Sequence, residues 1–320
     1  MPAALDEALN AEPAPEPAGN FHITDDHLGE GGAKQKYARN IEAIRTLFKL
    51  EQEHAGATAE EQQVLSQYVG WGGLSDAFDP SKDSWAKEYA ELKELLSEDE
   101  YAAARSSTLN AHYTSPTVIR GIYDAVERMG FQSGNILEPS MGVGNFFGML
   151  PTSMADSRLY GVELDSITGR IAKKLYPQAD ITVAGFETTD RRDFYDLAVG
   201  NVPFGQYKVN DKAYNKLGFS IHNYFSPKPS TKCVRAAWWR LLPVVTRWTV
   251  KILLPASTWQ NNADCWGPFV YPTTLSVPTL VRMLSATLSS CRSVTAPSTM
   301  SRTGCSWAKP RMALPSISIS

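Results

Sequence analysis

The amino-acid sequence predicts an α/β protein in which a small helical domain precedes an incomplete, doubly wound parallel sheet. Three observations predict this architecture. Apolar residues recur at helical spacing within residues 31–108. From residue 109 to about residue 225, short apolar strands alternate with helices, which is the pattern of βαβ units. Beyond residue 225 the alternation stops, so the last strands of such a sheet are missing.

The first 30 residues are acidic and rich in proline and alanine, and we expect them to form a disordered lead-in. They lack the basic start and the apolar stretch of a signal peptide. The chain also has no apolar run of the roughly 18 residues that a membrane span needs. We therefore expect a cytoplasmic protein that does not enter a membrane.

The helical region, residues 31–108, has apolar side chains at helical spacing over residues 34–54 and a charged helical stretch over residues 84–105. Two pairs of residues have the spacing of capping boxes at helix starts: Thr58 with Glu61, and Ser97 with Glu100. The glycine-rich segment YVGWGGLSDAFDP (68–80) is interpreted as a packed connector in preference to a substrate loop. This region shows no obvious chemistry.

The next region, residues 109–225, begins with Ser115 and Pro116, residue types that start helices, and an apolar stripe follows them. Strand and helix then alternate through NILEPSMGVGNFFGML and LYGVELDSITGRIAKKLYP. Two further strands follow in ITVAGFE and DLAVGN. In sheets of this kind, ligands bind at the carboxyl ends of the strands, and the chemically informative residues lie there.

A nucleoside cofactor is indicated at the ends of the first two strands. Gly142 and Gly144 allow the backbone to turn tightly against a ligand. Glu163 ends the second strand and is placed either to accept hydrogen bonds from ribose hydroxyls or only to cap the next helix. Phe147 occupies the third glycine position of a G-x-G-x-x-G pattern, which disfavours NAD, and no P-loop is present.

The end of the fourth strand reads DLAVGNVPFGQY, residues 196–207, and suits an exocyclic amino group. The side-chain carbonyl of Asn201 and a backbone carbonyl near Pro203 can accept both of its N–H bonds, which turns the nitrogen lone pair toward an electrophile. Phe204 can stack on a base that has left the duplex. Pro203 stiffens the loop and offers no N–H of its own.

Five motifs in this order resemble those of the methyltransferases that act on N6 of adenine in DNA. They are His112 to Pro116 (HYTSP), Glu138 to Gly144 (EPSMGVG), Glu163, Phe186, and Asn201 to Phe204 (NVPF). The resemblance covers residues 109–225. More narrowly, NVPFG and the segment WGG (71–73) are similar to the methylase region of large methylase/helicase fusion proteins of conjugative elements and phages, in which a helicase region follows.

The resemblance implies a Rossmann-like methyltransferase core, S-adenosylmethionine as cofactor, DNA with a flipped adenine as partner, and no metal. It assigns Thr114, Glu138, Gly142 and Gly144 to the methionine end of the cofactor, Glu163 to its ribose and Phe186 to its adenine. It assigns Asn201, Pro203 and Phe204 to the target base. Two departures are Gly185, where many relatives have an aspartate that reads the cofactor adenine, and Val202, where the common motif has proline.

Two alternatives stay open. Residues 1–225 carry a net charge of −13, which does not favour DNA by itself, so the methyl acceptor can instead be an RNA base or a protein glutamine. A non-catalytic module for DNA docking or assembly within a larger protein is the other alternative. In each case the chain is interpreted as a fragment of a larger protein.

Residues 226–320 have no clear period, a net charge of +10, and all four cysteines of the chain. A basic DNA-binding tail and a disordered extension are two possible interpretations. A one-nucleotide frame slip near Phe225 fits better, because the shifted frame is compatible with FAKALDKVRPGGVV, a helix, a turn and a strand. We then expect no native domain in this tail, and a chain that folds poorly or is inactive.

Overall fold

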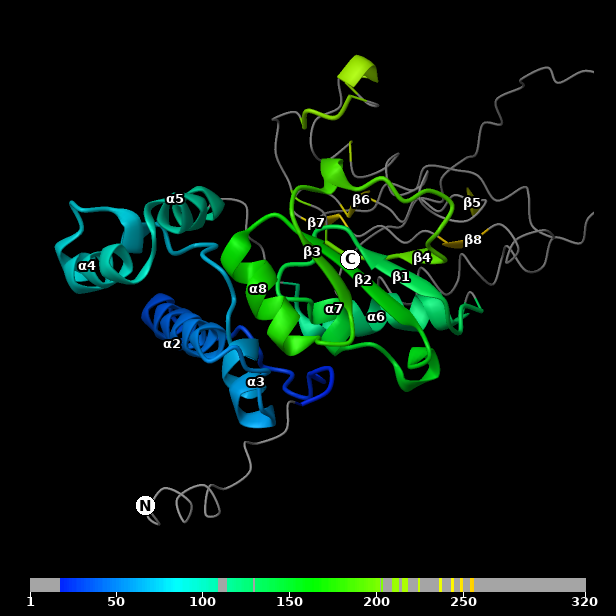
Figure 1. The fold of residues 1–320 in the computed structure, drawn as a ribbon, viewed down its shortest axis with the longest axis horizontal. Coiled ribbons are helices and arrows are strands. Elements are labelled where there is room, and N and C mark those ends of the chain that lie inside the picture. The colour runs from blue at the N-terminus through cyan, green and yellow to red at the C-terminus, as the bar shows by residue number, and fades with distance from the viewer. Residues whose placement is uncertain are drawn as a thin grey trace, which may run out of the picture.

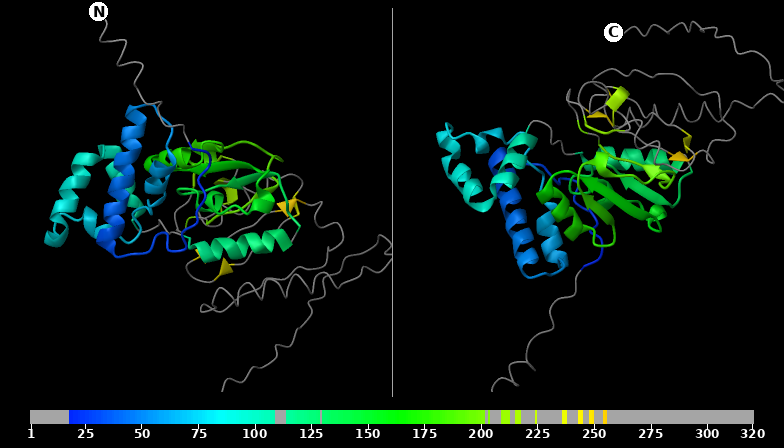
Figure 2. Two further views of the ribbon diagram at one scale, coloured as in Figure 1. Left: turned by 90° about the horizontal axis from the view of Figure 1, so that it is seen from below. Right: turned by 45° about the horizontal axis from the view of Figure 1, so that its top comes forward.

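The computed structural model of the chain describes residues 18–108, 114–128, 130–201, 203, 209–212, 215–217 and 224, and four two-residue strands between residues 236 and 255. The expected frame-slip junction near Phe225 and nearly all of the tail lie outside these residues, as does most of the expected lead-in. Figures 1 and 2 show a group of helices beside a twisted sheet that carries its own helices. No helix in the described part of the chain is long and apolar enough to cross a membrane.

The helical region contains four helices among its described residues: α2 (Ala33–Gln52), α3 (Ala59–Ser66), α4 (Ala86–Leu95) and α5 (Glu98–Ser107). Short 3-10 turns η1 (Ser75–Phe78) and η2 (Asp83–Trp85) connect α3 to α4. Both predicted capping boxes are present. The side chains of Thr58 and Ser97 accept from the backbone N–H groups of Glu61 and Glu100, and those two glutamates accept in return.

The segment 68–80 is packed into this helical region, in agreement with its interpretation as a connector. Trp71 is 1% exposed and contacts Phe78 edge-on, with ring centroids 5.2 Å apart. Tyr37 on α2 and Tyr68 also lie against Trp71. Asn40, a buried residue on α2, fixes the backbone of the segment by donating to the carbonyl of Gly70 and accepting from the N–H of Val69.

The sheet has four parallel strands in the order β3-β2-β1-β4: β1 (Asn135–Glu138), β2 (Arg158–Glu163), β3 (Asp180–Val183) and β4 (Leu197–Ala198). The helices α6 (Pro116–Arg128), α7 (Asn145–Gly148) and α8 (Ser166–Leu175) accompany it. Short 3-10 turns are η3 (Thr152–Met154), η4 (Phe186–Thr188) and η5 (Asn215–Leu217). The predicted α/β class with an incomplete Rossmann-like sheet preceded by helices is confirmed.

Four two-residue strands lie beyond the parallel sheet. β5 (Ala236–Ala237) pairs with β8 (Leu254–Pro255), and β6 (Pro243–Val244) pairs with β7 (Trp248–Thr249). Both pairs are antiparallel. In the described part of the chain, neither pair extends the four-stranded sheet.

Alternate residues of the strands face two different apolar clusters, as the pleat of a strand requires. Ile136, Leu159 and Leu197 belong to the main core, which contains residues from α2, α3, α6 and α8. On the opposite face, Leu137, Val162 and Ala198 belong to a smaller cluster with Phe186, Tyr195 and Tyr224. The main core therefore continues from the helical region into the sheet.

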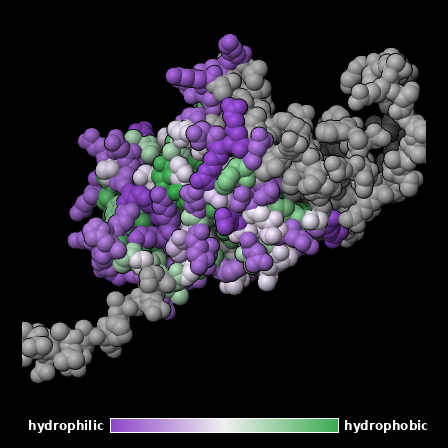
Figure 3. Space-filling model, turned by 45° about the vertical axis from the view of Figure 1, so that its right-hand side comes forward, coloured by the Kyte–Doolittle hydropathy of each residue, from purple (hydrophilic) through white to green (hydrophobic). Residues whose placement is uncertain are grey.

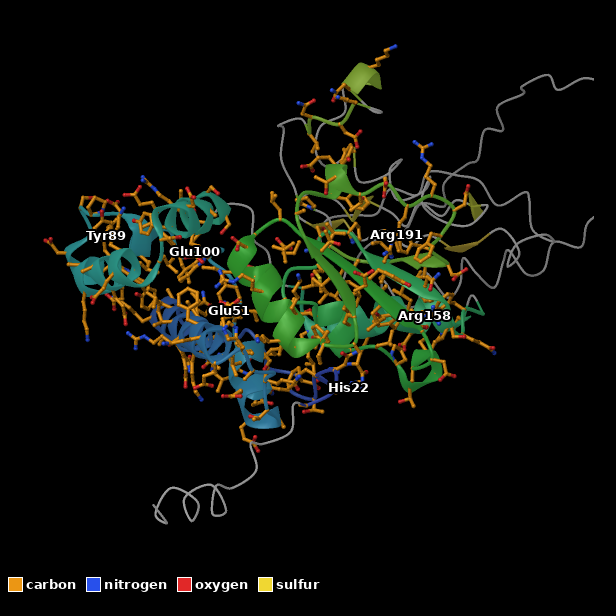
Figure 4. The ribbon with its side chains drawn as sticks, in the orientation of Figure 1. His22, Glu51, Tyr89, Glu100, Arg158 and Arg191 are labelled. Carbon is orange, nitrogen blue, oxygen red and sulfur yellow. The ribbon has the colours of Figure 1, made fainter. Side chains whose placement is uncertain are left out.

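Polar contacts between α8 and the helical region support this shared core. Arg170 on α8 pairs with Glu51 on α2 and with Glu100 on α5, and both carboxylates lie on the side of α8 that faces these helices (Figure 4). Gln62 on α3 donates to the carbonyls of Lys174 and Leu175 at the end of α8. On the face that Figure 3 shows, the described residues present a mostly hydrophilic surface with smaller apolar areas.

Part of the expected lead-in lies against these elements. The N–H of Phe21 donates to the carbonyl of Leu175, and the N–H of Ile23 donates to the carbonyl of Gly148. Hydrogen-bonded structure thus begins before residue 30, the boundary expected from composition. The reason is that two backbone groups of this segment bond to helix ends, which composition does not reveal.

Candidate functional site

The order of the strands places a switch point between β1 and β4. The chain builds the sheet outward through β1, β2 and β3, and then returns to add β4 on the other side of β1. Ligands of open α/β sheets bind at such a point, outside the carboxyl ends of the strands. Glu138 ends β1, Glu163 ends β2, and Asn201 follows β4 within three residues, so these three residues belong to the same edge of the sheet.

The carboxylate of Glu163 holds the turn that follows β1. Its Oε2 accepts from the backbone N–H of Gly142 at 2.8 Å, and its Oε1 accepts from the N–H of Asp165 at 2.9 Å. Burial raises the pKa of Glu163 to about 6, although the two N–H donors act in the opposite direction. Glu163 therefore lies where the ends of two neighbouring strands meet.

Glu138 is a buried carboxyl group with 2% of its surface exposed. Burial raises the pKa of Glu138 well above its usual value, and the negative charge of Glu163 adds to this effect. Its Oε2 atom has no hydrogen-bond partner among the described residues. Two acidic groups near each other in a buried place favour a cationic ligand, because a positive charge compensates the desolvation of both.

The turn between β1 and α7 depends on glycine at the two positions that the sequence singled out. Gly142 has φ +57°, and a Cβ there would meet open space, so only its backbone conformation disfavours other residues. Gly144 has φ +84° and precedes α7, and a Cβ there would lie 2.5 Å from the ring of Tyr176. The open space beside Gly142 is compatible with a ligand lying along the backbone of this turn.

One hydrogen bond joins this turn to the loop after β4. The hydroxyl of Ser140 donates to the backbone carbonyl of Asn201 at 2.9 Å. Asn201 and Pro203 are half-buried. Val202 and Phe204 lie outside the described residues, so the structure places the beginning of the NVPF motif and not its aromatic ring.

Phe186 lies after β3, in the 3-10 turn η4, and is buried. It packs edge-on against Tyr224, with ring centroids 6.4 Å apart, and the Tyr224 hydroxyl donates to the Asp211 carboxylate at 2.6 Å. The carboxylate of Glu187 occupies the space beside Gly185: a Cβ built on Gly185 would lie 2.0 Å from its Oε1. An acidic group is thus present next to Phe186 although residue 185 is glycine.

Thr114 is buried and lies two residues before the start of α6. Tyr123 of that helix donates to the carbonyl of Phe146, just after the glycine turn. Sequence reasoning gave no role to Ser140, Asp211 or Tyr224, although Ser140 stands inside the quoted EPSMGVG motif. Ser140 could have been singled out from the sequence because it lies between Glu138 and Gly142 of that motif. Asp211 and Tyr224 gave no signal, because their pairing depends on how the chain folds back.

Comparison with known proteins adds a second line of evidence. No model of a known protein family matches the chain. The defense against restriction protein B of Escherichia phage P1 is 27% identical to it over 154 residues, which are 47% of this chain and 5% of that protein. The type II methyltransferase M.CvrRI of Paramecium bursaria Chlorella virus XZ-6E is 34% identical over 93 residues, 29% of this chain and 24% of that protein. These matches relate part of the chain to methyltransferases.

The matched stretch makes up a quarter or less of each relative's length, so this relationship concerns a part of each protein. No solved structure matches the chain significantly. Methyltransferases in general use S-adenosylmethionine, a cofactor with a positive charge on its sulfur and on its amino group. The buried carboxyl group of Glu138, the half-buried carboxylate of Glu163 and the open turn at Gly142 fit such a cofactor.

Proposed function

We propose that this chain carries the core of an enzyme that transfers a methyl group from S-adenosylmethionine to the N6 amino group of adenine in DNA. One arrangement carries the proposal. Glu138, Glu163 and Asn201 converge at the switch point of the sheet, and the turn with Ser140 and Gly142 connects them. A site for a cationic nucleoside ligand then adjoins a carbonyl-rich loop suited to an amino group.

On the cofactor side, the buried carboxylate oxygen of Glu138 without a partner would take the ammonium group of the methionine end. Thr114, Gly142 and Gly144 would line that end. Glu163 would accept from the ribose hydroxyls, and Phe186 would pack on the adenine. When bound, the cofactor supplies an electrophilic methyl group on a sulfonium.

On the base side, the Asn201 side-chain carbonyl and a backbone carbonyl near Pro203 would accept the two N–H bonds of the target amino group. The nitrogen lone pair then turns out of conjugation with the ring and faces the methyl group. Phe204 would stack on the flipped base, since the amino group cannot reach the site inside a duplex. In this mechanism, positioning and fixed carbonyl dipoles supply the rate enhancement.

Similarity to a type II methyltransferase and to a protein named for defense against restriction supports DNA as the target. We further propose that the core works in the cytoplasm within a larger protein that has a helicase region. Residues 226–320 would then be out of frame, and the last strands of the sheet would be absent. Sequencing the gene across codons 220–230 tests this directly, because a single clean frame with the tail as written contradicts the slip.

The test of the function uses two proteins. One is the 320-residue chain, and the other, called the frame-restored protein, is the product of the same gene with one nucleotide inserted after the codon of Phe225. Asn201→Ala in the frame-restored protein is expected to abolish methyl transfer to DNA while affinity for S-adenosylhomocysteine is kept. If the chain is a non-catalytic docking module, the frame-restored protein without any substitution shows no methyl transfer. If it methylates only RNA or protein, that acceptor replaces DNA as the proposed substrate.

A further inference from the structure

The segment from Tyr68 to Gly73 belongs to the helical region, and its Tyr68 reaches the start of α8. Asn40 fixes the start of the segment by two hydrogen bonds to the backbone of Val69 and Gly70, and Trp71 anchors it in the aromatic cluster. The N–H of Gly73 donates to the carbonyl of Thr108, the residue from which the chain continues toward Thr114. The segment is therefore held rigidly from the side of the helical region.

Tyr68 points from this segment toward α8. It is 1% exposed, and its hydroxyl lies near the side chains of Thr168, Asp165 and Trp71. Thr168 and Trp71 lie within hydrogen-bonding range of that hydroxyl, but no described residue makes a hydrogen bond of good geometry with it. Burial raises the pKa of Tyr68, and the negative charge of Asp165 raises it further. The hydroxyl therefore stays protonated and is available as a donor.

The groups beside Tyr68 connect directly to Glu163. Asp165 is the N-cap of α8, and its Oδ2 accepts from both the N–H and the hydroxyl of Thr168, at 2.8 and 2.5 Å. The N–H of Asp165 donates to Glu163 Oε1. Tyr68 is thus linked to Glu163, the proposed ribose-binding carboxylate, through a single residue, the helix cap Asp165.

We infer that Tyr68 is a positioning residue of the cofactor site, whose hydroxyl gains its hydrogen-bond partner when a ligand occupies the Glu163 turn. The helical region is then part of that site. A ligand that donates to Glu163 competes with the N–H of Asp165, so the cap beside Tyr68 adjusts when the ligand binds. A buried donor without a partner destabilises the ligand-free state. Its gain of a partner on binding adds to the affinity for the ligand.

A purely structural role for Tyr68 leads to a different expectation for ligand affinity. If the ring only fills the core beside Trp71, removal of the unsatisfied hydroxyl leaves ligand affinity unchanged. Tyr68→Phe removes that one group and keeps the ring. Tyr37→Phe is the matched control, because Tyr37 belongs to the same aromatic cluster and its hydroxyl bonds to the carbonyl of Glu88 and to Glu91, within the helical region.

The experiment measures binding of S-adenosylhomocysteine by calorimetry and thermal unfolding without ligand, for the 320-residue chain and, in parallel, the frame-restored protein. Tyr68→Phe is expected to weaken binding by roughly fivefold to tenfold, the loss of about one hydrogen bond, with an unchanged or higher melting temperature. Tyr37→Phe is expected to lower the melting temperature and leave affinity unchanged.

The inference rests on the proposed function, and the outcomes separate the two. If neither unsubstituted protein binds S-adenosylhomocysteine, the proposed cofactor is wrong and the inference falls with it. If an unsubstituted protein binds and its Tyr68→Phe variant binds equally well, the role of Tyr68 alone is refuted. A drop in melting temperature with unchanged affinity likewise assigns Tyr68 a structural role and overturns the inference.

Discussion

The hydroxyl of Ser140 donates a hydrogen bond of 2.9 Å to the backbone carbonyl of Asn201. Ser140 belongs to the turn after β1, whose Gly142 is held by Glu163, and Asn201 follows β4 on the other side of the switch point. This bond ties the loop proposed to hold the target base to the turn proposed to hold the cofactor. The two halves of the candidate site are thus connected through protein atoms.

Ser140→Ala in the frame-restored protein is expected to slow methyl transfer about tenfold while affinity for S-adenosylhomocysteine stays unchanged. The physical reason is that the Asn201 loop loses one hydrogen bond and the precision of its placement, which directly affects the transfer step. Single-turnover transfer of labelled methyl groups measures this. Ser153→Ala is the control, since Ser153 bonds to exposed Glu127 on the surface. Equal transfer rates in Ser140→Ala and the unsubstituted protein would contradict the coupling.

Cofactor affinity is expected to depend on the protonation of Glu163. Its pKa is raised to about 6, so the folded chain holds this proton more tightly than the unfolded chain. The contribution of Glu163 to stability therefore falls as the pH rises from about 4.5 through 6. A ligand that donates to Glu163 needs the carboxylate, which is depleted below pH 6.

We thus expect affinity for S-adenosylhomocysteine to fall about tenfold between pH 7.5 and pH 5, measured by calorimetry. Glu163→Gln is expected to bind weakly at pH 7.5 and to lose this part of the pH dependence. The difference between the two profiles isolates Glu163 from Glu138. Identical profiles for the variant and the unsubstituted chain would show that Glu163 does not bind the ligand.

Glu138→Gln separates a ligand-binding role from a structural one. Burial and the charge of Glu163 favour the protonated form of Glu138, so a neutral amide of the same shape costs the ligand-free fold little. The variant is expected to keep or raise the melting temperature at pH 7.5. It is expected to bind S-adenosylhomocysteine at least about tenfold more weakly, because the ammonium group loses its counter-charge. Glu127→Gln on the exposed surface serves as control. A large drop in melting temperature with unchanged affinity would make Glu138 structural.

Glu187 is expected to supply the acidic group that the resemblance to adenine methyltransferases leads us to expect at position 185. Its carboxylate occupies the space beside Gly185, next to Phe186. Glu187→Ala should weaken S-adenosylhomocysteine binding roughly fivefold, the loss of one charge-assisted hydrogen bond. Gly185→Asp combined with Glu187→Ala should restore it, since the new side chain then has room. Calorimetry measures the affinity of the single and double variants for S-adenosylhomocysteine. Full affinity in Glu187→Ala would show that Glu187 does not contribute to ligand binding.

The sequence was sufficient to predict the alternation of strands and helices, both capping boxes, and the positions of Glu138, Glu163 and Asn201 at strand ends. These follow from local patterns: period, cap spacing and the residue that ends each strand. The order of the strands, the bond from Ser140 to Asn201 and the contact of Tyr68 with the cap of α8 depend on pairings between distant segments. No local pattern encodes such pairings. The early start of ordered structure near Phe21 escaped prediction for the same reason.

Identification of the methylated product is the sharpest test of the proposed function. The frame-restored protein is incubated with unmethylated DNA and S-adenosylmethionine labelled in its methyl group, and the nucleosides are analysed by mass spectrometry. Labelled N6-methyladenine is expected with the frame-restored protein, and none with its Asn201→Ala variant or with the 320-residue chain. Label in cytosine, or equal amounts of N6-methyladenine with Asn201→Ala, would refute N6-adenine methylation by this site.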